Sequence, residues 1–229
     1  MSNVNSLATL SHLRVQLSAL APLGSFTEAE WGAVDASFVY PQEEAQLRNA
    51  SSGRRGEFIA GRASLRRALT KAGFIPGALV SDEEGLPVLP LGAVASISHS
   101  RGLCCAVAGK STSFAGLAID IERTDRLRAP AAKRVMHPLE RDWASDDPVR
   151  WSLLFSLKEA FYKMQFPRWK VCANFKDLAL DVDLAGGRAQ ALQVAPIFGE
   201  ALRQRSDQIC FSFALFGSYV ASLCWLPAD

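Results

Sequence analysis

The sequence predicts an α+β fold made of two similar α/β halves. Two observations support this prediction: a basic helical segment at 54–74 precedes a group of strand-like runs, and a second helical zone at about 130–166 precedes another such group. A helix followed by paired strands, repeated once, is typical of an internal duplication, although no clear sequence repeat accompanies it. The predicted division falls after Glu122. It gives halves of 1–122 and 123–229, which together also count as one single domain.

Bulk composition restricts the class of protein. The chain has 229 residues, of which 49% are hydrophobic and 21% charged, as expected of a globular protein with a substantial core. A net charge of +2 gives no global attraction to nucleic acid or membrane, so we expect neither as a partner. The five cysteines have no CxxC spacing, and the N-terminus has no secretory pattern. We therefore expect a cytoplasmic protein with reduced cysteines.

Apolar spacing and turn residues predict the elements in order. Residues 13–20 and 36–40 have strand-like composition. The basic helix is followed by a loop rich in glycine and proline. Three strand candidates come next, with a short turn between the last two: 94–100, 103–109 and 113–122. In the second half, a helix at 151–164 precedes a strand-like segment at 175–184, and two β-rich runs around Gly217 predict a hairpin rather than a membrane span.

The stretch GLAIDIERT at 116–124 places two carboxylates one residue apart. In a strand, Asp120 and Glu122 share one face, while Ile119 and Ile121 share the other. Neighbouring acids repel each other, most strongly when desolvated, and a cation between them would relieve that cost. Taken alone, the stretch is more simply explained as an exposed strand with a hydrated acidic face.

A third carboxylate lies on the second predicted helix. Glu159 lies next to Lys158 and one turn from Lys163, which by itself predicts an ordinary surface ion pair. Combined with Asp120 and Glu122, however, it completes a set of hard oxygen ligands of the kind that Mg²⁺ prefers. The two lysines would suit a pyrophosphate. This combination is expected for transfer at a phosphoanhydride.

Three arginines can share one side of the basic helix. Arg55, Arg62 and Arg66 are seven and four residues apart, which places them on one face. Such a face either binds phosphate groups or is simply solvated. No interleaved aromatic residues accompany the arginines, which disfavours nucleic-acid binding.

Four segments, taken in order, resemble the Sfp-type 4′-phosphopantetheinyl transferases, and in particular the bacterial branch that includes enterobactin-synthase component D. These segments are EFIAGRASLRRAL, GLPVLP with SISHS, GLAIDIERT and FSLKEAFYK, which span residues 57–163. The last two are the specific ones, because GxxIDIExT followed by SxKEAxYK at this separation rarely arises by chance. The chain departs from the pattern at Phe155, where many relatives have tryptophan.

The resemblance implies a set of site residues. Mg²⁺, or Mn²⁺ in its place, would be held by Asp120, Glu122 and Glu159. Lys158 and Lys163 would contact the phosphates of coenzyme A, with Thr124 nearby. The 3′-phosphate would be bound by His99, with Ser98 beside it, and by Arg62, with Arg55 as a second candidate. The Gly85-Leu86-Pro87 loop would lie near the adenine.

The resemblance also implies the pseudo-duplicated 4′-phosphopantetheinyl transferase fold, a monomer with the active site between its halves. The reaction would move 4′-phosphopantetheine from coenzyme A to a serine of an apo acyl or peptidyl carrier protein, releasing adenosine 3′,5′-bisphosphate. Glu159 or a metal-bound water would take the serine proton, and Lys163 would neutralise the departing phosphate. Carriers of fatty-acid, polyketide, nonribosomal-peptide and siderophore synthesis all fit, and an acidic carrier would suit the basic side chains of Lys133, Arg134 and Arg141.

Two other functions are compatible with these residues. The acidic and lysine positions alone would also allow a Mg²⁺-dependent phosphohydrolase of nucleotides or pyrophosphates, with water as the acceptor. A non-catalytic module that binds coenzyme A or a carrier is the second alternative. Because every expected metal-site acid and lysine is present, the sequence argues against a loss of catalysis.

Overall fold

The computed structural model describes residues 3–32 and 39–229. The chain divides into two compact units, Met1–Ser113 and Phe114–Asp229. The division predicted from the sequence lay later, after Glu122. In the structure the whole of strand β4 (Phe114–Arg123) pairs within the second unit, which places the division before the strand rather than after it.

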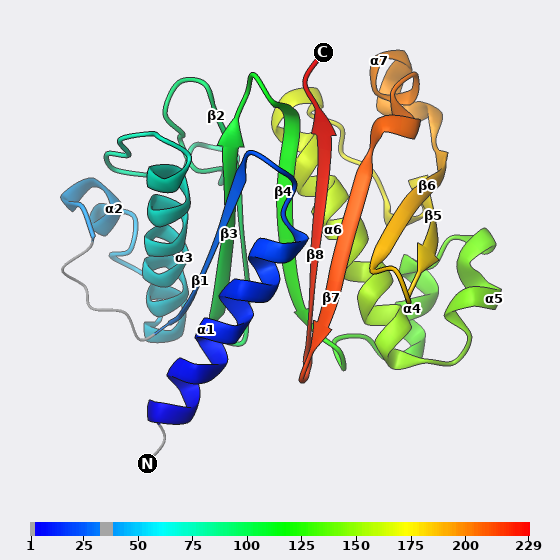
Figure 1. Ribbon diagram of the computed structural model, residues 1–229, viewed down its shortest axis with the longest axis horizontal. Helices are drawn as coiled ribbons and strands as arrows, with labels where there is room; N and C mark the ends of the chain where they lie inside the picture. Colours follow the sequence, from blue (N-terminus) through cyan, green and yellow to red (C-terminus); the bar gives the residue numbers. More distant parts are fainter. Residues whose placement is uncertain (1–2, 33–38) are drawn as a thin grey trace. The chain divides into compact units, whose positions relative to one another are not determined.

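The first unit is a three-stranded antiparallel sheet covered by helices. The strands are β1 (Ser25–Trp31), β2 (Ala93–Ser100) and β3 (Leu103–Lys110), in the order β1-β3-β2. Helix α3 (Ser52–Lys71) packs on all three strands, as Figure 1 shows. Helix α1 (Asn3–Leu20) packs on β1, and the short helix α2 (Pro41–Ala45) precedes α3.

Residues 13–20 are helical, so the strand predicted for them is wrong. Leu10, Leu13 and Leu17 are almost completely buried, and their spacing of three and four residues is that of one helix face. Packing on β1 therefore decides the conformation of this segment. The strand predicted at 36–40 lies mostly outside the described residues.

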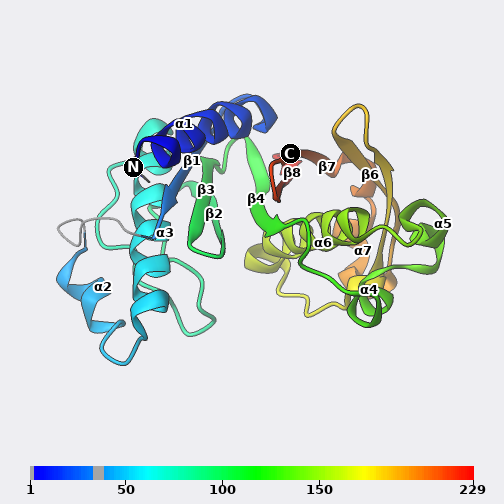
Figure 2. The same cartoon turned by 90° about the horizontal axis from the view of Figure 1, so that it is seen from below.

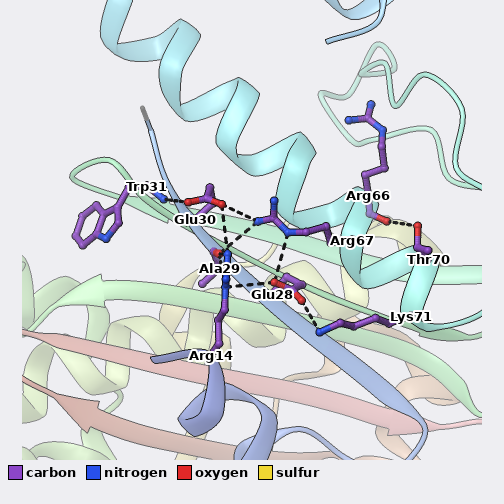
Figure 3. A network of polar contacts seen from close by, with 9 residues as sticks. All are labelled: Arg14, Glu28, Ala29, Glu30, Trp31, Arg66, Arg67, Thr70 and Lys71. Carbon is purple, nitrogen blue, oxygen red and sulfur yellow. Dashed lines mark hydrogen bonds and ion pairs between the residues drawn. The ribbon is translucent and has the colours of Figure 1, made fainter. Parts of the chain in front are cut away.

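An ionic network ties α1 and α3 to β1. Glu28 on β1 is only 5% exposed, and it pairs with Arg14 of α1 at 3.4 Å and with Arg67 of α3 at 3.5 Å. Lys71 of α3 pairs with the same carboxylate, as Figure 3 shows. Because a buried charge is costly unless it is paired, these contacts hold both helices on the same strand.

The second unit is a five-stranded antiparallel sheet of β4, β5 (Leu178–Asp183), β6 (Arg188–Val194), β7 (Cys210–Phe216) and β8 (Tyr219–Pro227), in the order β4-β8-β7-β6-β5. The long helix α6 (Pro148–Trp169) packs on β4 and β8 (Figure 2). The shorter helices are α4 (Ala129–Val135), α5 (Arg141–Ala144) and α7 (Gly199–Arg203).

The two units share one connectivity. In the first, β1 leads through α3 to the β2–β3 hairpin, whose last strand pairs with β1. In the second, β4 leads through α6 to the β7–β8 hairpin, whose last strand pairs with β4, and β5 and β6 are inserted before that hairpin. The predicted α+β fold of two similar halves is therefore confirmed.

Two local predictions have opposite outcomes. The final hairpin forms around Gly217, whose φ of 56° suits the turn. By contrast, β3 and β4 do not pair with each other as expected, because β3 lies between β1 and β2 in the other sheet. The five cysteines, all within the described ranges, take part in no disulfide: Cys104, Cys105 and Cys224 are buried, Cys210 is partly buried and Cys172 is exposed. No helix among the described residues is both long enough and apolar enough to cross a membrane.

Candidate active site

The two strand carboxylates lie at the carboxyl end of β4. Ile119 and Ile121, which share one face of the strand, are fully buried. Asp120, on the other face, is only 2% exposed, because α6 packs on this strand. A hydrated acidic face is therefore the wrong explanation for Asp120. Glu122, which lies two residues further along the same face of β4, is partly buried.

Helix α6 carries the third carboxylate and starts at a well-defined cap. The Asp147 side chain accepts hydrogen bonds from the backbone N–H groups of Val149 and Arg150, and Pro148 occupies the first turn. Leu154 and Leu157 on the inner face of the helix are fully buried. These contacts fix the helix on the sheet and so determine where its polar residues lie.

The side chains of α6 and β4 meet at a charged contact. Lys163 Nζ donates to Asp120 Oδ1 at 2.6 Å. The pKa of Glu159 is raised, chiefly by burial and then by the negative charge of Asp120, with Glu122 contributing in the same direction. The three carboxylates, which we call the acidic cluster, are therefore close enough to repel one another. Their role as a metal site stays a prediction.

Arg126 is a residue that the sequence interpretation missed. Its Nε lies 3.4 Å from Glu122 Oε1, and its charge lowers the pKa of Glu159, opposing the larger upward effects. Its spacing of four residues from Glu122 was the available signal. That spacing is informative on a helix, however, and Glu122 had been assigned to a strand.

Lys158 does not join the acidic cluster. Its side chain is 2% exposed, and Nζ donates to Glu140 Oε2 at 2.7 Å and to the carbonyl oxygens of Val135 and Phe175 at 2.9 Å. These three acceptors match the three protons of an ammonium group. Burial lowers the pKa of Lys158. The structure thus places this lysine in a buried ion pair rather than on a phosphate-binding surface.

Glu140, the partner of Lys158, was also missed. It is 1% exposed and accepts hydrogen bonds from the backbone N–H groups of Leu180 on β5 and of His137. This single carboxylate therefore links α6, β5 and the turn after α4. Its one local signal is the capping box that it forms with His137, three residues earlier, whereas Lys158 and Leu180 are distant in the sequence.

A pocket opens beside Glu159 within the second unit. Its volume is about 390 Å³, and its lining combines apolar, aromatic and polar groups. The lining residues are Lys158, Glu159, Phe161, Tyr162, Cys172, Ala173, Asn174, Phe175, Leu178 and Phe198.

The three predicted arginines of α3 form ion pairs or hydrogen bonds with other residues of the first unit and do not form an open basic face. Arg55 pairs with Glu44 at 2.7 Å, and Arg66 pairs with the fully buried Glu43. Arg62 is 8% exposed, and burial lowers its pKa to about 10. Its guanidinium donates to the Leu79 carbonyl and to the Ser81 hydroxyl. In this structure Arg62 and Arg66 are buried or partly buried, whereas Arg55 is more exposed, and phosphate binding by these arginines stays a prediction.

A different arginine lies beside the predicted His99. Arg54 Nη1 lies 3.0 Å from His99 Nε2, and His99 Nδ1 lies 3.4 Å from Glu57 Oε2. Arg54 belongs to the first turn of α3, where the Ser51 side chain caps the helix. Ser98, by contrast, is buried within β2. The resemblance had named Arg55, not Arg54, as the second candidate for the 3′-phosphate at this helix end.

The remaining predicted positions have structural contacts. The Gly85-Leu86-Pro87 turn has a φ of 79° at Gly85 and closes on Asp82, which accepts from the backbone N–H of Leu86. Pro87 forms an isolated antiparallel β-bridge with Ser81, whose hydroxyl accepts a hydrogen bond from Arg62. Thr124 bonds through its backbone N–H to Ser218, and its carbonyl accepts from Ser152 on α6.

The chemistry of the acidic cluster suits a hard divalent cation, although its present geometry is not that of a preformed centre. Three carboxylates with mutual repulsion are the donor set that Mg²⁺ prefers. Among the described residues, however, no group of three or more potential ligands is already arranged around one point. In this structure the Lys163 ammonium takes one Asp120 oxygen. The oxygen donors suit the cation, and the Lys163 ammonium contacts Asp120 Oδ1, one of the oxygens that would bind it.

Comparison with known proteins decides the family. Residues 42–109 match the model of the 4′-phosphopantetheinyl transferase N-terminal domain, and residues 116–224 match that of the 4′-phosphopantetheinyl transferase superfamily. The transferase Svp of Streptomyces mobaraensis is 33% identical over 194 residues, covering 80% of this chain and 79% of the relative. The chain belongs to the 4′-phosphopantetheinyl transferase superfamily. It is therefore an enzyme of this class, as the sequence predicted.

Other members of the superfamily are similar over comparable lengths. The transferase Npt of Nocardia iowensis is 30% identical, covering 66% of this chain and 70% of the relative. PptT of Mycobacterium tuberculosis is 31% identical, covering 71% and 74%. The resemblance to the branch of enterobactin-synthase component D stays a prediction.

Solved holo-ACP synthases are similar to part of this 4′-phosphopantetheinyl transferase chain. The enzyme from Plasmodium yoelii is 16% identical with a TM-score of 0.41, covering 51% of this chain and 96% of that chain. The enzyme from Neisseria meningitidis is 18% identical with a TM-score of 0.39, covering 51% and 99%.

Proposed function

We propose that the protein transfers 4′-phosphopantetheine from coenzyme A to a serine of an apo acyl or peptidyl carrier protein. The contact that supports this best is between α6 and β4, where Lys163 lies 2.6 Å from Asp120 and the pKa of Glu159 is raised. A carboxylate with a raised pKa is suited to accept a proton, and an adjacent ammonium is suited to a phosphate. The enzyme acts as a cytoplasmic monomer in this proposal.

The transfer step follows from these roles. The serine Oγ attacks the phosphorus next to the pantetheine arm and forms a new P–O bond, while the anhydride P–O bond to the other phosphate breaks. The leaving group is adenosine 3′,5′-bisphosphate. Glu159 takes the serine proton, and Lys163 offsets the charge that develops on the departing phosphate.

A divalent cation fits the same site. Asp120, Glu122 and Glu159 would hold Mg²⁺, or Mn²⁺ in its place, which when bound would polarise the phosphate oxygens. Lys163 would then move from Asp120 toward the phosphates.

Further support for coenzyme A as the substrate comes from each unit taken by itself. In the first unit, Arg54 and His99 come together at the N-terminus of α3, and helix N-termini favour anions. We assign the 3′-phosphate to this pair. In the second unit, the pocket of about 390 Å³ beside Glu159 has the mixed lining that an amide-containing, largely aliphatic pantetheine arm requires.

The decisive experiment is intact-mass spectrometry of an apo carrier protein incubated with this enzyme, coenzyme A and Mg²⁺. We expect a mass gain of one phosphopantetheine, and its loss when EDTA is added. Glu159→Gln should lower the rate by about a hundredfold or more, because it removes a general base. Glu83→Gln, which alters an exposed turn, is the matched control. Cleavage of coenzyme A without any gain on the carrier would instead support the phosphohydrolase alternative.

A further inference from the structure

The turn that follows β4 holds Arg126 in a defined place. The Arg126 N–H donates to the Arg123 carbonyl at 3.0 Å, which closes the turn. The next residue, Leu127, is 7% exposed, and its N–H donates to Ser152 Oγ of α6 at 3.4 Å. The same hydroxyl donates to the Thr124 carbonyl at 3.0 Å. The backbone of this turn is therefore anchored on both sides of Arg126.

The Arg126 side chain has partners on two elements. Its guanidinium carbon lies 5.4 Å from the centre of the Phe155 ring of α6, and its Nε lies 3.4 Å from Glu122 Oε1 of β4. Phe155 is itself supported by the ring of Phe175 at 5.3 Å. A stacked guanidinium keeps its contact with an aromatic ring whether or not it is also hydrogen-bonded. The contact with the Phe155 ring therefore holds the Arg126 guanidinium independently of its ion pair with Glu122.

We propose that Arg126 is a built-in competitor of the divalent cation for Glu122. In the metal-free protein, the guanidinium neutralises this carboxylate. When a cation binds the acidic cluster, Arg126 gives up Glu122 and stays on Phe155. This inference rests on the metal site proposed above.

The neighbouring arginine provides a matched control. Arg123 lies in the same turn, but its guanidinium is bonded to Asp125 through Nε at 2.7 Å and through Nη2 at 3.0 Å. Removing either arginine subtracts one positive charge near the acidic cluster. Only the loss of Arg126 removes a direct contact with a metal ligand.

Binding of Mn²⁺ to the full-length protein, without coenzyme A or carrier, tests the proposal. Electron paramagnetic resonance of free Mn²⁺ gives the Kd directly. Arg126→Gln should lower the Kd by about two- to fivefold, the range expected for one exposed ion pair. Arg126→Lys keeps the charge, so its Kd should lie between those of Arg126→Gln and the wild type. The Kd of Arg123→Gln should equal that of the wild type.

The outcomes separate this inference from the proposed function. If the wild type binds Mn²⁺ and Arg126→Gln has the same Kd, or the same shift as Arg123→Gln, direct competition is overturned while the metal site stands. If the wild type binds no Mn²⁺ at all, both the metal site and the competition are overturned. Circular dichroism and melting of each variant show whether its fold is intact.

Discussion

Gly116 on β4 faces Met164 on α6 at a distance that excludes any side chain. A Cβ atom at position 116 would lie 2.7 Å from the Met164 carbonyl oxygen and 2.6 Å from its sulfur. Because a helix carbonyl cannot rotate away, the glycine sets how closely α6 approaches the sheet. Lys163, which precedes Met164, reaches Asp120 from this position.

Gly116→Ala should therefore push α6 away from β4. We expect a loss of about 1–3 kcal/mol in the free energy of unfolding, as for other overpacked cores, together with a weaker Lys163–Asp120 contact and lower activity. Gly53→Ala on α3 is the control, because nothing lies within 4 Å of its added Cβ and alanine favours helix. Urea unfolding measures both. If Gly116→Ala were as stable as Gly53→Ala, the close contact between position 116 and Met164 would not limit how α6 packs on β4.

Glu159 should make the metal-free protein less stable when it is ionised. Its pKa is raised in the folded state, so folding binds its proton, and the ionised form costs stability above the raised pKa. In EDTA, Glu159→Gln should melt at a higher temperature than the wild type at mildly alkaline pH. The difference should shrink as the pH falls toward the usual glutamate pKa of about 4.3.

Melting curves at several pH values test this prediction. Glu83→Gln removes an exposed carboxylate and should follow the wild type throughout. A Glu159→Gln variant that is less stable than the wild type at alkaline pH would show that burial and repulsion do not govern this carboxylate.

The buried pair of Lys158 and Glu140 should govern stability more than substrate binding. Glu140→Ala leaves the ammonium buried without its counter-ion, for which we expect a loss of about 3–5 kcal/mol. Glu44→Ala, which removes the partner of Arg55 at an exposed pair, should cost about 1 kcal/mol or less. Chemical unfolding compares the two. Equal losses would mean that Lys158 is not held by Glu140 in solution.

Arg54 should recognise the 3′-phosphate of coenzyme A. Arg54→Gln removes a charged donor beside His99, so the KM for coenzyme A should rise by about tenfold or more. The KM for dephospho-coenzyme A should change much less. Arg55→Gln is the control, because Arg55 is paired with Glu44. Equal increases for both substrates with Arg54→Gln would assign this arginine another role.

Much of the fold was accessible from local patterns. The strands β2, β3 and β4, the helices α3 and α6 and the final hairpin all formed where apolar spacing and turn residues predicted them. Local signals do not say which strands become neighbours, however. The turn after β3 therefore suggested a hairpin with β4, whereas long-range pairing places β3 beside β1 and β2. Residues 13–20 became helical because β1 provides a surface for their leucines.

The sequence by itself singled out the charged residues of the candidate site: Asp120, Glu122, Glu159 and Lys163 were all predicted from spacing and resemblance. Only the tertiary structure decided the partner of each charge. Lys158 pairs with Glu140 across 18 residues, and Lys163 pairs with Asp120 across 43. The physical reason is that residue spacing governs contacts within one element, whereas ion pairing between elements depends on through-space distance and burial, which arise only when the helix packs on the sheet.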